Sequence, residues 1–83
     1  MPHSNILSIA EYHSGSDGEL YNSIIHAESE KEILEIFKTF LEQEEQEGHH
    51  CCVDVPDTFQ KLTRLDFTDS YNDRQYRTNG LII

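Results

Sequence analysis

The segment His49-His50-Cys51-Cys52 concentrates residue types that bind zinc. Ligand pairs in zinc sites are normally separated by two or more residues, so that both side chains can converge on the metal. Four adjacent ligands cannot do this without contorting the backbone, and His3, His13 or His26 would have to supply a remote ligand. The spacing favours histidines that follow a helix C-terminus and a cysteine that packs as a small apolar residue. We therefore assign no metal ligand and no cofactor, and keep a small metal-binding module as an alternative.

No other pattern in the chain predicts catalysis. There is no Gly-rich phosphate loop, no nucleophile elbow and no paired-ligand motif. Scattered carboxylates give no reason to select one acid–base pair. We therefore predict that the protein is not an enzyme and assign no catalytic residue.

The net charge of -10 lies mostly between residues 28 and 47, where eight Glu stand against Lys31 and Lys38. Phosphates and anionic lipid headgroups would repel such a surface, so we expect no direct binding to nucleic acid or membranes. No apolar run approaches the ~20 residues that span a bilayer. The expected partner is a basic protein.

The charged segment is predicted to be a helix of close to 18 residues that begins at a capping box, Ser29 to Glu32, and stops at Gly48. Its apolar residues recur at helical spacing and form one face. The carboxylates on the other side form a row of closely spaced charges. The predicted partner-binding residues on this segment are Glu28, Glu32, Glu35, Glu42 and Glu45.

Such a row of carboxylates is most often simply the solvent-exposed face of a helix. Two features favour a functional surface instead. Glu44, Glu45 and Glu47 fall in the last turn, where the helix dipole makes a carboxylate cost roughly 0.3–1 kcal/mol. A face selected only for solubility would mix Lys with Glu more evenly.

A second candidate surface lies near the C-terminus, where Tyr71, Arg74 and Tyr76 cluster with Arg77. Tyr and Arg are enriched at protein–protein hot spots, so the first three are added to the predicted partner-binding residues. The structural alternative is that the rings cover the sheet and the Arg residues pair with nearby Asp.

The predicted fold is one two-layer α+β domain over residues 1–83. An antiparallel sheet of four to five strands, in the order β-β-α-β-β, packs one face against the amphipathic helix. A hairpin of residues 6–13 and 20–27 turns at residues 14–18, and Asp57 caps a short helical turn. Further strands are predicted at residues 51–55, 64–71 and 75–78, followed by a turn at Asn79-Gly80.

This profile is similar in kind to small acidic phage inhibitors of CRISPR and restriction systems, and to immunity proteins and antitoxins. The similarity implies a protein that inhibits a nucleic-acid-handling complex or nuclease by occupying its binding surface, in some cases by nucleic-acid mimicry. The two adjacent cysteines favour a reducing compartment, the cytoplasm of the host cell if the chain is phage-encoded. The immunity-protein or antitoxin alternative and the oligomeric state stay open.

Overall fold

The computed structural model describes residues 5–13 and 19–82, with the side chains of residues 5–12 and 23–81. The helices and strands are β1 (Asn5–His13), β2 (Glu19–Ala27), α1 (Glu30–Gln46), α2 (Phe59–Leu62), β3 (Asp66–Asp69) and β4 (Arg74–Ile82). The predicted turn at residues 14–18 lies outside the described residues.

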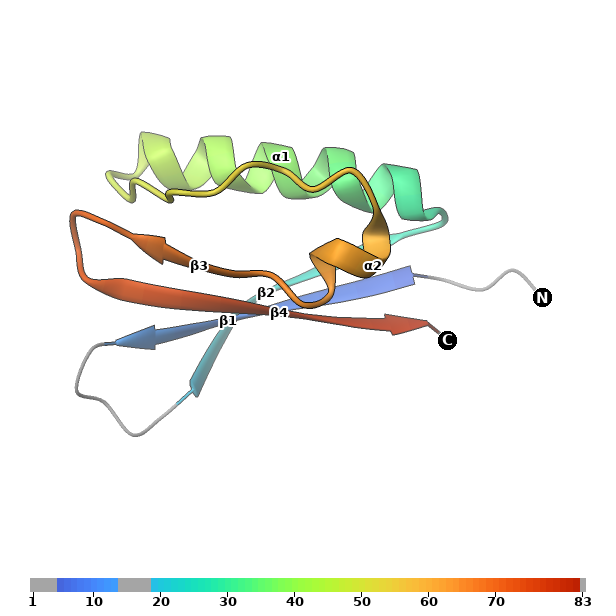
Figure 1. Cartoon of the computed structure of the whole chain (residues 1–83), viewed down its shortest axis with the longest axis horizontal. Coiled ribbons are helices and arrows are strands. Elements are labelled where there is room, and N and C mark those ends of the chain that lie inside the picture. The colour runs from blue at the N-terminus through green and yellow to red at the C-terminus, as the bar shows by residue number, and fades with distance from the viewer. Residues whose placement is uncertain (1–4, 14–18, 83) are drawn as a thin grey trace.

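The four strands form one antiparallel sheet in the order β2-β1-β4-β3, and α1 lies over one of its faces (Figure 1). The protein is therefore a two-layer α+β structure with one main helix, as predicted. The predicted order β-β-α-β-β is not confirmed, because the strand predicted directly after the main helix, at residues 51–55, is absent and α2 stands between α1 and β3. Within the described part, no helix is long and apolar enough to cross a membrane.

The core lies between α1 and the residues that alternate along the strands. Leu7 and Ile9 of β1 are fully buried together with Phe37 of α1. Phe37 meets the ring of Phe67 edge-on, with centroids 5.8 Å apart, and Phe67 stacks on Tyr76 at 4.9 Å. These edge-to-face and stacked ring contacts join α1, β3 and β4, and they add to the stabilisation from buried apolar area.

The start of α1 follows from its first residues. The Oγ of Ser29 accepts a hydrogen bond from the N–H of Glu32 at 3.1 Å, so the predicted N-cap is confirmed. Such a cap typically contributes ~1 kcal/mol, since it satisfies a backbone donor that the helix cannot. The apolar stripe then buries Ile33, Phe37 and Phe40.

The predicted strand at residues 51–55 is wrong. Only an isolated bridge between Cys51 and Asp69 is present, and the segment runs back beside α1 (Figure 1). Val53 and Val55 instead pack against the core from this loop. The alternating pattern therefore indicates only that every second side chain is buried. An extended loop that lies over the core can bury alternate side chains without pairing in a sheet.

The predicted cap of the helical turn is one residue off. The turn itself is present as α2, but the Oγ1 of Thr58 caps it by accepting from the N–H of Lys61 at 3.2 Å. Asp57 pairs with the ammonium of Lys61 at 3.0 Å instead. The side-chain hydrogen bond from Lys61 and then its charge lower the pKa of Asp57.

The C-terminal strands also differ from the prediction. β3 is only four residues long, and β4 continues without interruption through Asn79-Gly80 to Ile82, paired with the full length of β1. A Cβ on Gly80 would lie 2.0 Å from the Cγ2 of Thr63 and 3.0 Å from the ring of Phe59. Glycine is therefore needed here for the close approach of the α2 segment to β4, and not for a turn.

Replacing Gly80 by Ala should lower the free energy of unfolding by about 1–3 kcal/mol, because the added methyl forces α2 away from β4. Urea denaturation of the purified variant measures this. The exposed neighbour Asn79 provides the control, and Asn79→Ala should change stability by less than about 0.5 kcal/mol. Equal stabilities of the two variants would contradict the packing role of Gly80.

Candidate partner-binding surface

The end of α1 turns the chain so that His49 faces Glu44. Gly48 has a φ of +91°, a conformation that glycine adopts readily. Its N–H donates to the carbonyl of Glu45 at 3.0 Å, and the N–H of His49 donates to the carbonyl of Glu44 at 2.8 Å. These two bonds form a Schellman motif, which satisfies the last carbonyls of the helix. The predicted stop at Gly48 follows from this motif.

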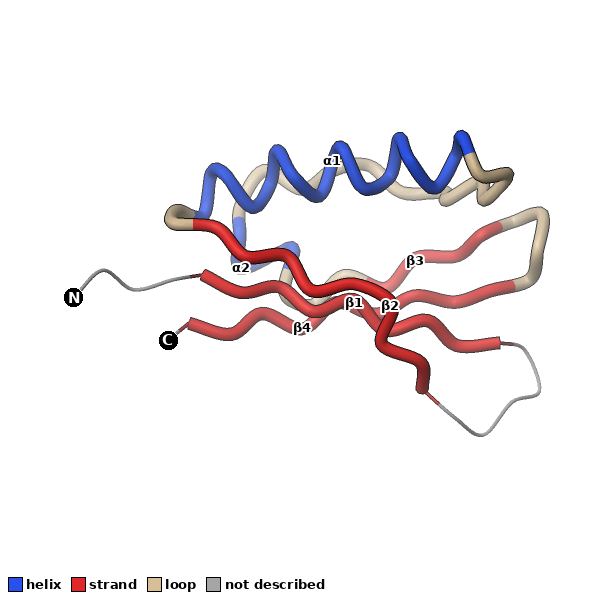
Figure 2. Tube along the Cα trace, turned by 180° about the vertical axis from the view of Figure 1, so that it is seen from behind, coloured by secondary structure: helices blue, strands red, loops and turns tan. Residues whose placement is uncertain are grey.

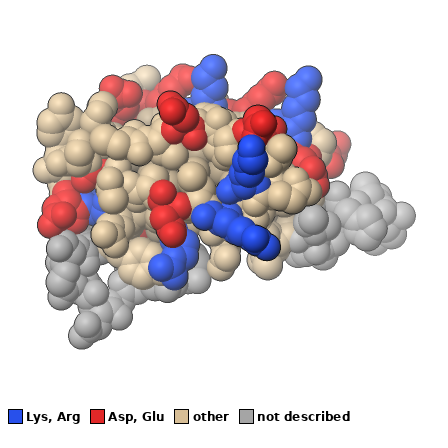
Figure 3. Space-filling view, in the orientation of Figure 1, with Lys and Arg blue, Asp and Glu red and all other residues tan. Residues whose placement is uncertain are grey.

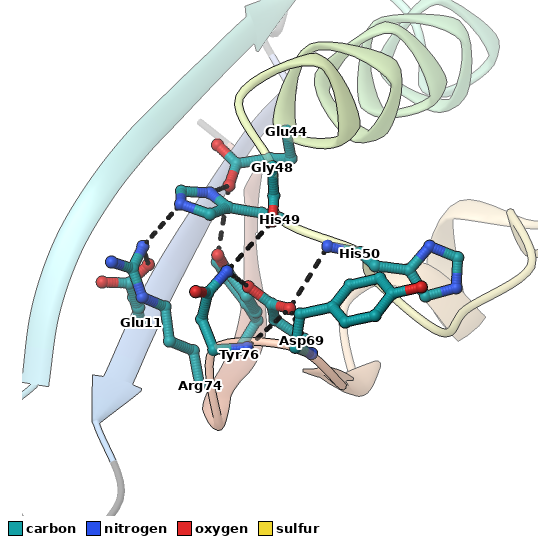
Figure 4. Close-up of polar contacts among 10 residues, drawn as sticks. Glu11, Glu44, Gly48, His49, His50, Asp69, Arg74 and Tyr76 are labelled. Carbon is teal, nitrogen blue, oxygen red and sulfur yellow. Dashed lines mark hydrogen bonds and ion pairs between the residues drawn. The ribbon is translucent and has the colours of Figure 1, made fainter.

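A chain of polar side chains connects this helix end to β4 and β1 (Figure 4). The Nδ1 of His49 lies 2.5 Å from the Oε2 of Glu44, and its Nε2 lies 2.9 Å from the Nη1 of Arg74. The same Nη1 donates to the Oε2 of Glu11 at 3.2 Å. Because a guanidinium only donates, Nε2 must accept, and the hydrogen-bond network assigns the imidazole proton to Nδ1. His49 thus bridges Arg74 and Glu44, because it accepts from the guanidinium at Nε2 and donates to the carboxylate at Nδ1.

Tyr76 adds a fourth contact to this polar network, which consists of Glu11, Glu44, His49, Arg74 and Tyr76. Its hydroxyl donates to the Oε2 of Glu44 at 3.1 Å, while its ring is buried in the core. Burial and then the charge of Glu44 raise the pKa of the phenol, so it stays a neutral donor. Among the described residues, every buried side-chain nitrogen or oxygen has a hydrogen-bond partner. The network therefore stabilises the packing of α1 on the sheet.

Asp69 organises the turn beside the network. It is only 1% exposed, and its Oδ1 accepts from the N–H groups of His50, Tyr71 and Asn72 at 2.9–3.2 Å. Its Oδ2 accepts from the side-chain amide of Asn72 at 2.8 Å. Burial alone would raise the pKa of Asp69, but these hydrogen bonds outweigh it and hold the pKa below its usual value.

The two cysteines differ in exposure and in acidity. Cys52 is exposed and Cys51 is half-buried, and both are free thiols. Burial, followed by the charges of Glu44 and Asp69, raises the pKa of Cys51 to about 12. A thiol with such a pKa is protonated at neutral pH, and the thiolate is the form that binds metal. Cys51 is therefore almost entirely protonated at neutral pH.

Three other side chains bring ligand-type atoms together. Those of Glu44, Glu47 and His49 all lie within 4.8 Å of one another. Both ring nitrogens of His49 already contact Glu44 and Arg74, however. A cation here would have to compete with the contacts that His49 makes to Glu44 and Arg74 in the polar network.

The predicted acidic residues lie on and just before α1, and Glu28, Glu32, Glu35, Glu42 and Glu45 are all exposed. Acidic side chains run along the helix in the space-filling view, with Lys side chains among them (Figure 3). Glu45 lies 3.9 Å from the imidazole of His50. Within the described part of the chain, no ion pair engages the other four. We call Glu28, Glu32, Glu35 and Glu42 the acidic row.

Glu44 has a different role from its neighbours. It is half-buried and accepts hydrogen bonds within the polar network. Its position in the last turn of α1 is therefore explained by internal contacts, without a partner. The dipole argument for a functional surface now rests on the exposed residues Glu45 and Glu47 alone.

The second predicted surface is not one surface. Tyr76 points into the core, and Arg74 is half-buried between Glu11 and His49. Tyr71 is 77% exposed and its ring lies 5.2 Å from that of His50. Of these three residues only Tyr71 thus offers a large accessible area, and the surface proposed below contains none of them.

Sequence reasoning missed Glu11 as a member of the polar network. The signal was present, since Glu11 follows Leu7 and Ile9 at the spacing of side chains on one face of a strand. Arg74, Tyr76 and Thr78 share the same spacing on β4. An acid and a base at inward positions of two strands predict a buried ion pair only if the two strands are neighbours in the sheet. The pairing of β1 with β4 joins residues far apart in the sequence, so local patterns did not reveal that these strands are neighbours.

Comparisons of the chain with protein-family models, curated proteins and solved structures find no match.

Replacing Asp69 by Asn should cost about 2 kcal/mol of stability near pH 7, because the charged acceptor of four hydrogen bonds is lost. A lowered carboxyl pKa contributes stability above the unfolded-state value, and that contribution disappears as the pH falls through the folded-state value. The wild type should therefore lose this advantage progressively as the pH is lowered through the acid range, measured by urea unfolding at each pH.

The control is Asp73→Asn, an exposed residue in the same turn whose φ of 54° Asn tolerates. Its effect should stay within about 0.5 kcal/mol at each pH. If Asp69→Asn were equally mild near pH 7, Asp69 would not organise the turn.

Alkylation should separate the two thiols. Near pH 8, only about one in ten thousand Cys51 side chains is ionised at a pKa of about 12. Iodoacetamide should therefore modify the exposed Cys52 first, and mass spectrometry of the peptide fragments identifies the site. Cys52→Ser should abolish the fast phase and Cys51→Ser should leave it unchanged. A fast phase that survives Cys52→Ser would contradict the high pKa of Cys51.

Proposed function

We propose that this protein binds and inhibits a basic, nucleic-acid-handling partner by occupying the surface that the partner uses for nucleic acid. The observation that supports this most is the acidic row, which is exposed and has no cationic partner among the described residues. By contrast, Lys61, Arg74 and Arg77 each pair with a carboxylate away from α1. The fold thus leaves the carboxylates of the acidic row exposed on one helix and available to a basic groove.

The number of carboxylates in the acidic row indicates whether the protein would imitate a whole DNA duplex or occupy only part of a basic groove. From Glu32 to Glu42 the helix rises ~15 Å and presents three carboxylates of the row. A DNA duplex of that length carries about nine phosphate charges, one per ~1.7 Å. Lys31 and Lys38 weaken the field further. The row therefore suits occupation of part of a basic groove better than imitation of a whole duplex.

A binding protein also agrees better with the described interior than an enzyme does. Every buried side-chain nitrogen and oxygen of the described residues has a hydrogen-bond partner within the protein, and the groups of the polar network link elements of the fold. An active site needs such groups aimed at a substrate. The specific version that we favour is a phage anti-defence protein, of the anti-CRISPR or anti-restriction type, acting in the host cytoplasm. The free thiols Cys51 and Cys52 are compatible with that reducing compartment.

Glu32, Glu35 and Glu42 replaced together by Gln should weaken partner binding by at least about tenfold at about 0.1 M salt and flatten its salt dependence. The partner is captured from host lysate on the immobilised wild-type protein and identified by mass. Its affinity for each variant is then titrated at several salt concentrations, with and without competing DNA.

The matched control removes the same charge elsewhere, from the exposed residues Asp54, Asp57 and Asp73, each replaced by Asn. This variant should bind almost as tightly as the wild type. If both triple variants lost affinity equally, net charge and not the acidic row would drive binding. Unchanged affinity and salt dependence of the Gln variant would show the proposed mechanism to be wrong.

A further inference from the structure

The two edges of the sheet are protected differently. At the β3 edge, the chain before β3 covers the backbone: the N–H of Cys52 donates to the carbonyl of Thr68 at 2.9 Å, and the N–H of Ser70 donates to that of His50 at 3.0 Å. At the other edge, β2 pairs with β1 alone within residues 5–13 and 19–82. Figure 2 shows β2 in front of the sheet, with α1 above it. Alternate N–H and C=O groups along β2 therefore point outward without a strand to receive them.

The regular part of this edge lacks the usual protection against pairing. A register shift between Ile9 and Ala10 marks a bulge in the first half of β2, while residues 23–27 pair regularly with β1. Residues 23–27 contain no Lys and no Pro, the residues that commonly block edges. Ile24, within this stretch, is 60% exposed. The stretch is therefore suited to accept another strand.

A groove runs between this edge and the helix. Its volume is about 410 Å³, and its apolar wall comes from Ile25 of β2 and from Ile36 and Phe40 of α1. Ser23, Ile24, Thr39 and Gln43 complete the lining. In a strand added beside β2, every second side chain points toward the helix layer. The groove lies where those side chains would go, which is the arrangement used in recognition by strand addition.

Charge decides which strand fits. On α1, Glu32 and Glu35 each stand one turn before a groove residue, Ile36 and Thr39, so their carboxylates flank the groove. A second copy of this chain would bring another net charge of -10 against them. A strand that carries Lys or Arg would be attracted.

We infer that the β2 edge and the adjoining groove bind an extended, basic segment of the partner protein as an additional strand. Apolar side chains of that segment enter the groove between Ile25 and Ile36, and its cationic side chains meet the acidic row. This inference rests on the proposed function, because it takes the basic partner from there and adds the mode of contact.

The test uses synthetic peptides of about ten residues, the length of a typical strand. In the first, called the alternating peptide, Val and Lys take turns at every second position, the positions that face the helix layer, and Thr fills the positions between them. The second is the same peptide N-methylated at every amide, which keeps its charge and removes its backbone donors. The third has the first peptide's composition with the basic residues in one block, and the fourth replaces the basic residues by Thr and Gln. Binding is measured by titration, and amide hydrogen exchange reports protection at residues 23–27.

The alternating basic peptide should bind and should slow exchange at alternate amides of residues 23–27 by at least about tenfold. The methylated and block peptides should bind at least about tenfold more weakly. Ile24→Thr should weaken binding of the alternating peptide severalfold, because Ile24 is exposed on β2 and would lose its apolar contact with the side chains of the added strand. Leu81→Thr is the matched control: Leu81 is 54% exposed on β4, and the change should leave binding unaltered.

The outcomes separate this inference from the proposed function. Equal binding by the alternating, methylated and block peptides, without protection of β2, overturns strand addition and leaves an electrostatic partner surface in place. Equal binding by the basic and neutral alternating peptides overturns the basic partner and with it the proposed function. Concentration-dependent protection of β2 in the free protein, with a dimer in sedimentation, assigns the edge to a second copy and overturns the inference. Failure of all four peptides to bind overturns it as well.

Discussion

The packing of one helix on one face of the sheet is the constraint on which the rest of this structure depends. The apolar stripe of α1 buries against the inward residues of the sheet, which include Ile25 and Ala27 of β2. Once Ile33, Phe37 and Phe40 are buried, the rotation of the helix is set and the acidic row must face solvent. The surface proposed to bind a partner is thus a consequence of core packing.

The polar network holds the C-terminal end of that helix in place. A helix that ends in carboxylates and has no basic residue in its last turn is disfavoured by its own dipole. Glu44 offsets this by accepting hydrogen bonds from His49 and Tyr76, and Arg74 supplies the cation one step further along. The network also carries a risk, since a buried charge left without its partner is costly. Stability and surface charge are therefore coupled at this end of α1.

The inferred strand-addition site and the acidic row are complementary in what they provide. Backbone pairing along β2 gives affinity with little dependence on side-chain sequence, whereas charge on α1 selects against acidic strands. Protection of the β3 edge by the preceding chain leaves the β2 edge as the accessible one within the described residues. A partner would therefore approach from the β2 side, where groove and acidic row lie together.

Local patterns were sufficient for α1, its Ser29 cap, its Gly48 stop and the β1–β2 hairpin, because these depend on residues within a few positions of one another. Local patterns failed at residues 51–55, where the alternation reflects a loop packed on the core and not a strand. They also failed at Gly80, where the glycine allows α2 to pack closely on β4 and does not form a turn. The burial of Tyr76 and the role of Glu44 also came only from the tertiary structure. Both depend on β4 crossing the sheet to pair with β1, and a contact between segments so distant in the chain leaves no periodic signal in either one.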